Sequence, residues 1–332
     1  MLEALIKRLE GYEAMLTANT YLSHSDLERA LSREEFFAYL EAAKKSSKPH
    51  HVFHTPYYDY AQLSDTLWVK AVAKEGVFER INLLKQPENT ERWRLKVAYD
   101  GTLFEGFQRQ NKTVRTVQGE LESALSHLHP EKISLHPASR TDKGVHAKAQ
   151  YVHFDTTKSH PVQDYPSLMN RLLPRDIRVL EALKVPNVFH ARYDVQEKTY
   201  RYRLATSVSL EQVHHVYETD HPSSACLNER LAVFVGTHDF ANFAKLKGAH
   251  TTLKTITRAQ ASVDHNDVII EIQGKGFVRY MVRMMVGAVL KYDAKTIAHA
   301  LNHPQEALGK HLAPAHGLTL YEIDYGQVTT PR

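Results

Sequence analysis

The stretch ASRTDKGVHAKAQ at residues 138–150 gathers the side chains most able to do chemistry. Its carboxylate, Asp142, stands between Arg140 and Lys143 and is followed by a glycine and by His146. An Asp before a Gly is typical of a turn, which explains such a pair in most proteins. A carboxylate held between cations can also act as a nucleophile, because neighbouring positive charge favours its ionised form. The local sequence leaves both interpretations open.

Three other stretches combine cations with aromatic rings. The first is GTLFEGFQRQNKT at residues 101–113, and the second is FHARYDVQEKTYRYRL at residues 189–204, which contains Tyr200. The third is a predicted helix that carries Arg279 and Arg283 four positions apart, so that both lie on one face. Taken singly, each stretch is typical of a solvated surface.

Several common kinds of site are not supported by the sequence. The GKG at residues 274–276 lacks the spacing of a phosphate-binding loop and is typical of a turn at a strand end. The three histidines within residues 50–54 would share a metal only on a helix, and the flanking prolines favour a solvated loop. A zinc-dependent base deaminase needs two cysteines, whereas this chain has only Cys226. No Gly-x-Ser-x-Gly elbow of a serine hydrolase occurs.

The elements that must position these residues mix strands and helices. Residues 93–99 alternate apolar and other side chains, as a half-buried strand does. Further strands are predicted over residues 132–136, 150–156, 176–185, 198–205, 256–263, 267–274 and 318–325. Helices are predicted over residues 1–16, 33–45, 165–174, 228–235 and 277–292 and from Thr116 onward, and the ambiguous residues 65–76 are interpreted as helical. Because strands and helices do not alternate strictly, the pattern favours the α+β class.

Length and composition favour a globular protein of two or three domains. The chain has 332 residues, and no apolar run approaches the ~18 residues that a membrane span needs. The N-terminal residues lack the apolar block of a signal peptide. The single cysteine excludes an internal disulfide bond, so we expect a reducing, cytoplasmic setting and no membrane partner.

Charge and glycine content change near residue 90. Of the 42 Lys and Arg and the 38 Asp and Glu, 12 and 14 lie in residues 1–92, which leaves 30 and 24, a net +6, in residues 93–332. Only two of the 14 glycines precede residue 93. We therefore predict a helical N-terminal module over residues 1–92, and a mildly basic remainder that suits a polyanionic partner.

Read in order, the motifs after residue 92 resemble the tRNA pseudouridine synthase A family. The family signature Gly-Arg-Thr-Asp-x-Gly-Val-His-Ala is matched at eight of nine positions by residues 139–147. The other family motifs appear as Tyr99-Asp100-Gly101, Gly106-Phe107-Gln108, Thr116-Val117-Gln118-Gly119, Leu173-Pro174, Phe189-His190-Ala191-Arg192, Tyr200-Arg201-Tyr202, the helix from Phe277 to Arg283, and Gly317 to Leu320. The resemblance spans residues 93–325.

The resemblance implies a pseudouridine synthase fold, in which a largely antiparallel or mixed sheet carries flanking helices and a central cleft. Its two halves would be residues 93–190, with the catalytic loop, and residues 191–332. The activity implied is an isomerase that converts uridine to pseudouridine in the anticodon stem-loop of tRNA. Members of the family are homodimers that clamp one tRNA, so tRNA and a second copy of the chain are the implied partners.

The same resemblance implies roles for four residues. Asp142 would be the nucleophile, and Arg283 the cation that keeps it ionised. Tyr200 would stack on the extruded uracil, and Arg140 would contact the RNA backbone or fill the space that the base leaves. Because the reaction has no redox step and needs no activated water, it implies no metal and no organic cofactor.

Two departures from the signature and two rival functions remain at this stage. Ser139 replaces the usual glycine, which would strain the loop if that position requires a positive φ. Lys143 stands where a small residue is common and either adds a cation beside the carboxylate or faces solvent or RNA. The rival functions are a non-catalytic tRNA-binding or tRNA-folding protein on the same scaffold, and a sister synthase with another RNA target.

Overall fold

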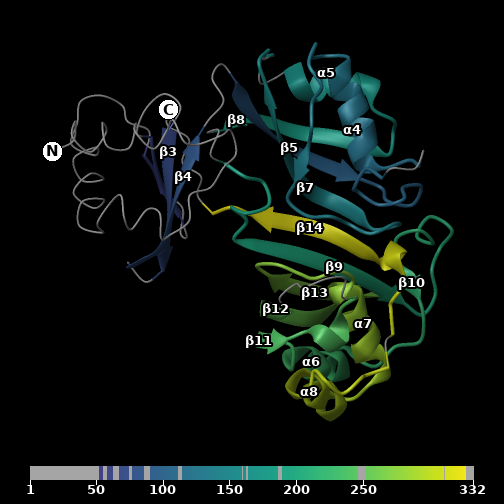
Figure 1. Ribbon diagram of the computed structural model, residues 1–332. Helices are drawn as coiled ribbons and strands as arrows, with labels where there is room; N and C mark the ends of the chain where they lie inside the picture. The colour runs from purple at the N-terminus through teal and green to yellow at the C-terminus, as the bar shows by residue number, and fades with distance from the viewer. Residues whose placement is uncertain are drawn as a thin grey trace.

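A computed structural model describes four strands within residues 52–85 and residues 90–326 apart from 111–113, 159, 162–163, 186–188, 246–251 and 310 (Figure 1). The helices predicted over residues 1–16 and 33–45 lie outside the described residues. None of the helices in the described part of the chain combines the length and the apolar character that a membrane crossing requires.

One ten-stranded mixed sheet forms the body of the chain after residue 90. Its order is β11-β12-β13-β9-β14-β7-β5-β8, with β10 beside β9 and β6 beside β7. The strands are β5 (Glu91–Tyr99), β6 (His136–Pro137), β7 (His146–Thr156), β8 (Ile177–Val185), β9 (Glu197–Ala205), β10 (Tyr217–Glu218), β11 (Gly236–Asp239), β12 (Leu253–Asp264), β13 (Asp267–Gly274) and β14 (Leu318–Asp324). The pairs β14–β7 and β10–β9 are parallel and the others antiparallel, which confirms the predicted α+β class.

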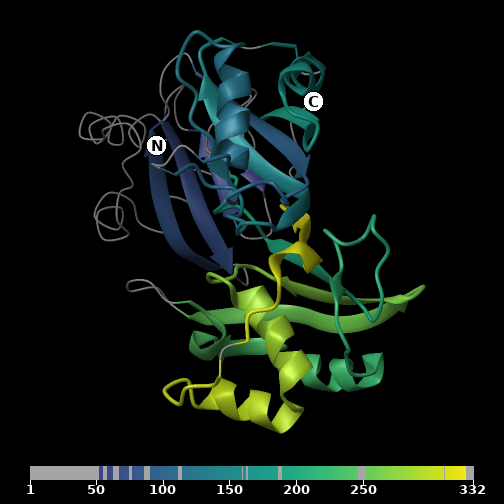
Figure 2. The ribbon, with the colours of Figure 1, turned by 90° about the vertical axis from the view of Figure 1, so that its right-hand side faces the viewer.

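Helices cover the two halves of this sheet separately (Figure 2). The first half carries α4 (Val117–Ser126) and α5 (Asp164–Leu172), and α5 packs on β8. The second half carries α6 (Ser224–Ala232), α7 (Met281–Lys291) and α8 (Ala294–Asn302), and α6 packs on β12. The helices α5, α6 and α8 each bury two or three residues against the rest of the fold, whereas α7 is buried along most of its length.

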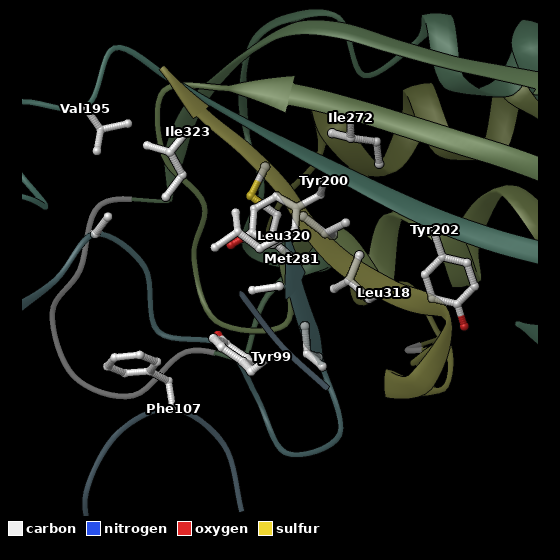
Figure 3. Packing of buried hydrophobic residues seen from close by; sticks show 14 of the residues in the cluster. Tyr99, Phe107, Val195, Tyr200, Tyr202, Ile272, Met281, Leu318, Leu320 and Ile323 are labelled. Carbon is white, nitrogen blue, oxygen red and sulfur yellow. The ribbon is translucent and has the colours of Figure 1, made fainter. Parts of the chain in front are cut away.

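The two halves meet at β14, the last described strand, which lies between β9 and β7. Apolar side chains from both halves pack at this junction (Figure 3). Tyr99 from β5, Tyr200 from β9, Met281 from α7 and Leu320 from β14 are all buried there. The junction therefore gives residues that lie far apart in the sequence a common rigid support.

Strands 93–99, 176–185, 198–205, 318–325 and the hairpin 256–274 are confirmed with small shifts of their ends. The helix predicted over residues 277–292 begins only at Met281, because Tyr280 before it has a left-handed backbone with φ of 66°. The strand predicted over residues 132–136 is wrong, since only His136 and Pro137 pair there with β7.

The described part of the segment before residue 90 is a sheet, which contradicts the helix expected over residues 65–76. It has the antiparallel order β1-β2-β3-β4, with β1 (Val52–His54), β2 (Tyr58–Gln62), β3 (Leu67–Lys74) and β4 (Val77–Lys85). The pairing of β3 with β4 extends to Lys74 and Val77. The valines of β3 favour a strand over a helix, and the partner strand decides the outcome.

Candidate active site

Asp142 lies in a tight turn on the loop that leads into β7. The Val145 N–H donates to the Asp142 carbonyl oxygen at 3.1 Å, and Gly144 between them has a positive φ of 77°. A left-handed residue at this position is why the signature needs a glycine there. The turn interpretation of Asp142 is thus right for its backbone, and it leaves the carboxylate free for another role.

The loop after β5 supports this turn from one side. A side chain on Gly101 would place its Cβ 2.1 Å from the Val145 carbonyl oxygen, so the two backbones touch. The Phe107 N–H donates to the Thr141 carbonyl at 3.1 Å, and Gly106 packs beside it with φ of 100°. The first cation-and-ring stretch therefore positions the Asp142 loop through backbone contacts.

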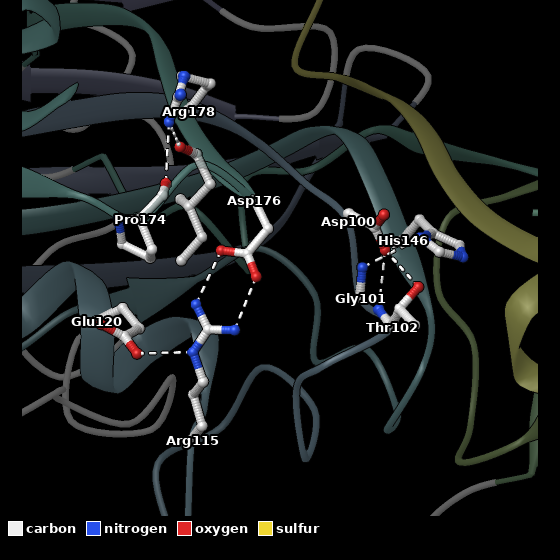
Figure 4. Close-up of polar contacts among 10 residues, drawn as sticks. Asp100, Gly101, Thr102, Arg115, Glu120, His146, Pro174, Asp176 and Arg178 are labelled. Carbon is white, nitrogen blue, oxygen red and sulfur yellow. Dashed lines mark hydrogen bonds and ion pairs between the residues drawn. The ribbon is translucent and has the colours of Figure 1, made fainter. Parts of the chain in front are cut away.

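Arg115 fixes the far end of that supporting loop (Figure 4). Its guanidinium donates to both carboxylate oxygens of Asp176 at 2.7 and 2.9 Å and to Glu120 at 3.0 Å. It also lies 4.2 Å from the centre of the Phe104 ring. A two-pronged contact of this kind restricts movement more than a single hydrogen bond does.

Side chains of the sheet hold the other side of the Asp142 loop. The Tyr99 and Thr141 hydroxyls are 2.7 Å apart and share a hydrogen bond. The side-chain amide of the buried Gln150 accepts a hydrogen bond from the Ser139 N–H and donates one to the Ser139 carbonyl. The buried Lys198 ammonium donates to the Ala138 carbonyl at 2.8 Å. The Asp142 loop is therefore held on a fixed frame, as a site that must orient a reacting group requires.

Arg283 is the cation nearest to Asp142 in the described part of the chain. Its Nη1 lies 3.8 Å from Asp142 Oδ2, and the two side chains are 12% and 26% exposed. Arg283 Nε also donates to the Ala313 carbonyl at 2.7 Å, which fixes the guanidinium. Because Asp142 is on the first half and Arg283 on α7 of the second, the pair joins the halves.

Burial raises the pKa of the Asp142 carboxyl above its usual value, and the charges of Arg283 and Arg279 oppose that rise. Burial also lowers the pKa of the Arg283 guanidinium, against the effect of the Asp142 charge. The carboxylate is therefore poorly solvated yet still favoured in its charged form by a nearby cation. A poorly hydrated anion of this kind is reactive as a nucleophile or a base.

Tyr200 is buried beside the same loop. Its ring meets the Phe277 ring edge to face at 5.1 Å, and its hydroxyl lies 2.9 Å from Ser139 Oγ. Burial raises the pKa of the Tyr200 phenol to about 12, with a smaller contribution from the Asp142 charge. The phenol is therefore neutral at physiological pH and has one proton to donate.

The structure brings three of the four expected site residues together. Asp142, Arg283 and Tyr200 converge on one loop, whereas Arg140 is exposed and makes no salt bridge with any described residue. Lys143 is also turned outward, where its ammonium pairs with Glu105 at 2.5 Å. Sequence reasoning missed the supporting roles of Gln150 and Lys198, whose only signal was a polar residue at an inward position of a strand.

Two side-chain clusters have the composition of a metal site but not its hydrogen bonding. They are His136, His153 and His190, and Asp100, His146 and His215 (Figure 4 shows Asp100 and His146). Backbone N–H groups already donate to Nδ1 of His153, His190 and His146. In a neutral imidazole whose Nδ1 accepts a hydrogen bond, the proton is on Nε2. The lone pair of Nδ1 is then already used and Nε2 has none to offer, so neither nitrogen can bind a metal. We assign no metal to either cluster.

The arrangement is a candidate active site, with one poorly solvated carboxylate beside a fixed cation at the junction of the two halves of the sheet. The family model for tRNA pseudouridine synthases matches residues 96–194 and 231–326. The tRNA pseudouridine synthase A of Halalkalibacterium halodurans is 43% identical over 235 residues, which cover 68% of this chain and 89% of that protein. Its counterparts in Anoxybacillus flavithermus and Bacillus pumilus are 39% and 38% identical, each over 69% of this chain. The chain belongs to the tRNA pseudouridine synthase family, which confirms the resemblance.

Proposed function

We propose that this protein is an isomerase that converts uridine to pseudouridine in tRNA, with Asp142 as its essential carboxylate. The observation that carries the proposal is the position of Asp142, half-buried on a rigid signature loop beside Arg283. The family to which the chain belongs is described by the same activity. A protein that only binds tRNA would have no use for a poorly solvated carboxylate, because that group repels phosphate.

The reaction rearranges one nucleoside without adding or removing atoms. The bond between uracil N1 and ribose C1′ breaks, the ring turns, and C5 bonds to C1′. C5 gives up its proton and N1 takes one up, so no oxidant, reductant or water is consumed. Asp142 supplies the electron pair that the reacting carbon or the leaving proton needs, which is the role of a carboxylate nucleophile or base.

The neighbouring side chains fit the remaining tasks. Arg283 keeps the Asp142 carboxylate charged when the bound RNA excludes water. The Tyr200 ring stacks on the extruded uracil, which repays part of the few kcal/mol that flipping a base costs. Arg140, exposed on the same loop, contacts the RNA backbone or occupies the place that the base has left.

We further propose the anticodon stem-loop as the target, a homodimer as the working form and the cytoplasm as the setting. The relatives that cover most of this chain are named tRNA pseudouridine synthase A, which supports the choice of tRNA. The net charge of +6 after residue 92 suits a polyanion shared between two subunits. A synthase acting elsewhere in tRNA is the alternative that the experiment distinguishes.

The test is to incubate the purified protein with unmodified tRNA and to map pseudouridine along each molecule by chemical labelling and sequencing. We expect new pseudouridines in the anticodon arm with the wild-type protein and none with Asp142→Asn. Pseudouridine confined to another arm would overturn the target assignment alone. Tight tRNA binding without any pseudouridine would overturn the proposed activity.

A further inference from the structure

Ser139 makes a contact that the usual signature residue could not make. Its Oγ lies 2.9 Å from the Tyr200 hydroxyl, and glycine, the residue of the family signature, has no side chain to reach it. Ser139 is also not among the described non-glycine residues with positive φ, which are His265 and Tyr280. The serine therefore fits its backbone without strain, and its hydroxyl is an addition to the loop.

The backbone of Ser139 is unusually well fixed. Gln150, which is fully buried, accepts from the Ser139 N–H at 3.2 Å and donates to its carbonyl at 2.7 Å. The preceding carbonyl, of Ala138, accepts from the Lys198 ammonium at 2.8 Å. Because the serine side chain has a single rotatable bond before its oxygen, a fixed backbone gives a hydroxyl with very few positions.

Tyr200 is held at its other end by the sheet and by one ring. Its backbone lies in β9, paired with Ile272 of β13 and Leu320 of β14, and its ring meets Phe277 edge to face. Within the described residues, Ser139 is the one hydrogen-bond partner of the phenol. The phenol stays neutral because burial raises its pKa to about 12, so it can both accept and donate one hydrogen bond.

We propose that Ser139 is a positioning residue for Tyr200. Its hydroxyl bonds the phenol and fixes the plane of the Tyr200 ring, so that the face of the ring meets the bound uracil in one orientation. This inference rests on the proposed function, in which Tyr200 stacks on that base beside Asp142. Ser139 itself does not touch the base, so its loss affects the reaction of bound RNA rather than the binding of RNA.

The competing explanation is a hydrogen bond that serves stability alone. An ordinary bond between two hydroxyls is worth about 1 kcal/mol, whichever purpose it serves. The two explanations differ in what happens when the Tyr200 hydroxyl is absent. A positioning role for Ser139 disappears in a Tyr200→Phe background, whereas an independent effect of Ser139 on the loop persists.

The experiment is a double-mutant cycle on the full chain, measured as single-turnover pseudouridine formation with tRNA bound to saturation. We expect Ser139→Ala to slow the reaction about fivefold, with the Kd for tRNA within about twofold of wild type. Ser139→Thr, which keeps the hydroxyl, should restore most of the rate. The double variant Ser139→Ala/Tyr200→Phe should be no slower than Tyr200→Phe.

Controls keep the outcomes distinct. Ser262→Ala removes an exposed serine hydroxyl on β12, which β13 separates from the strand of Tyr200, and this variant should match wild type. If Ser139→Ala does not fold, Ser139→Gly takes its place in the cycle. Additive losses in the double variant, an unchanged rate for Ser139→Ala, or a loss confined to tRNA affinity would each overturn the positioning role. An active Asp142→Asn protein in the same assay would instead overturn the proposed function on which it rests.

Discussion

At the scale of single residues, two opposing effects act on the pKa of Asp142, namely its burial and the positive charge beside it. Burial disfavours its ionised form, and the guanidinium of Arg283 restores part of that loss without reaching hydrogen-bond distance. A closer, two-pronged ion pair would hold the carboxylate more tightly and make it a poorer nucleophile. The 3.8 Å separation therefore suits a group that must react.

If Asp142 is the nucleophile that we propose, Asp142→Asn should lose at least ~1,000-fold in rate. It should also be more stable than wild type at neutral pH. The folded-state pKa of Asp142 lies above the unfolded value, so both states are protonated at very low pH and the burial cost is absent there. The loss of stability from burying the charged carboxylate develops as the pH rises through the folded-state pKa. Asparagine has no charge, so the variant does not lose this stability. Denaturant unfolding at pH 4 and pH 7 checks this, and equal stabilities at pH 7 would contradict it.

Arg283→Met should shift the acidic limb of the pH–rate profile to higher pH. The charge of Arg283 is the largest influence lowering the pKa of Asp142, so its removal leaves burial less opposed. Arg283→Lys keeps the charge and serves as the matched control, with a smaller shift. Single-turnover rates between pH 5 and 8 provide the measurement, and identical limbs for both variants would argue against an ionised Asp142 in the reaction.

At the scale of elements, the site depends on the close approach of two loops. Gly101→Ala should cost about 1–3 kcal/mol of stability and most of the activity, because its Cβ would lie 2.1 Å from the Val145 carbonyl. Gly276→Ala is the matched control, since no atom lies within 4 Å of the added Cβ. Its stability should stay within about 0.5 kcal/mol of wild type. Similar effects at both positions would show that contact with Val145 is not the cause.

Burial of the Lys198 ammonium on β9 lowers the stability of the fold by an amount that depends on pH. Burial lowers the pKa of its ammonium to about 8, against ~10.4 in an unfolded chain. Below pH 8 it is charged in both states and its burial is unfavourable. As the pH rises from about 8 to ~10.4, the folded state releases the proton first, and wild type should gain stability, on the order of 3 kcal/mol at most, relative to Lys198→Met. Unfolding of both proteins at pH 7.5 and 9.5 measures this difference, and a constant difference would contradict it.

Local patterns predicted the elements whose signal is contained in their own residues. β5 alternates so regularly that its four buried residues could be read directly, and α5 ends near Pro174 as expected. The β3–β4 pair was missed because a strand is decided by its partner, and α8 because it follows α7 after only two residues. Periodicity contains no information on the order of the strands, so the central place of β14 could not be derived.

The candidate site was predicted on a different basis. Asp142 from its own sequence is a turn residue, and only the ordered motifs connected it with Arg283 and Tyr200, which lie far along the chain. The contact between Ser139 and Tyr200 could not be foreseen, because the serine differs from the signature and its partner is 61 residues away. The departure at Lys143 proved to be an outward ion pair with Glu105.

At the scale of the whole molecule, the segment before residue 90 lies outside the residues that the family model matches. Both the family match and the site residues lie after it, so a chain beginning at Thr90 should still form pseudouridine, at a rate within about tenfold of the full chain. It retains Glu91 and Arg92, which belong to β5 and pair with β7. The comparison is of single-turnover rates on one tRNA. A folded, tRNA-binding truncated protein without activity would show that the earlier segment helps to build the site.

The position of β14 makes the sheet beside the site depend on a late segment of the chain. Its residues, Leu318–Asp324, are translated after every other described strand, yet they lie between β9 and β7. Leu320 pairs with Ala147, a few residues from the turn that holds Asp142. Until this strand pairs, the edges of β9 and β7 that it covers stay open, and open strand edges are prone to mispairing. A chain in which residues 318–324 have not yet paired therefore lacks the strand that supports β7 beside the Asp142 turn.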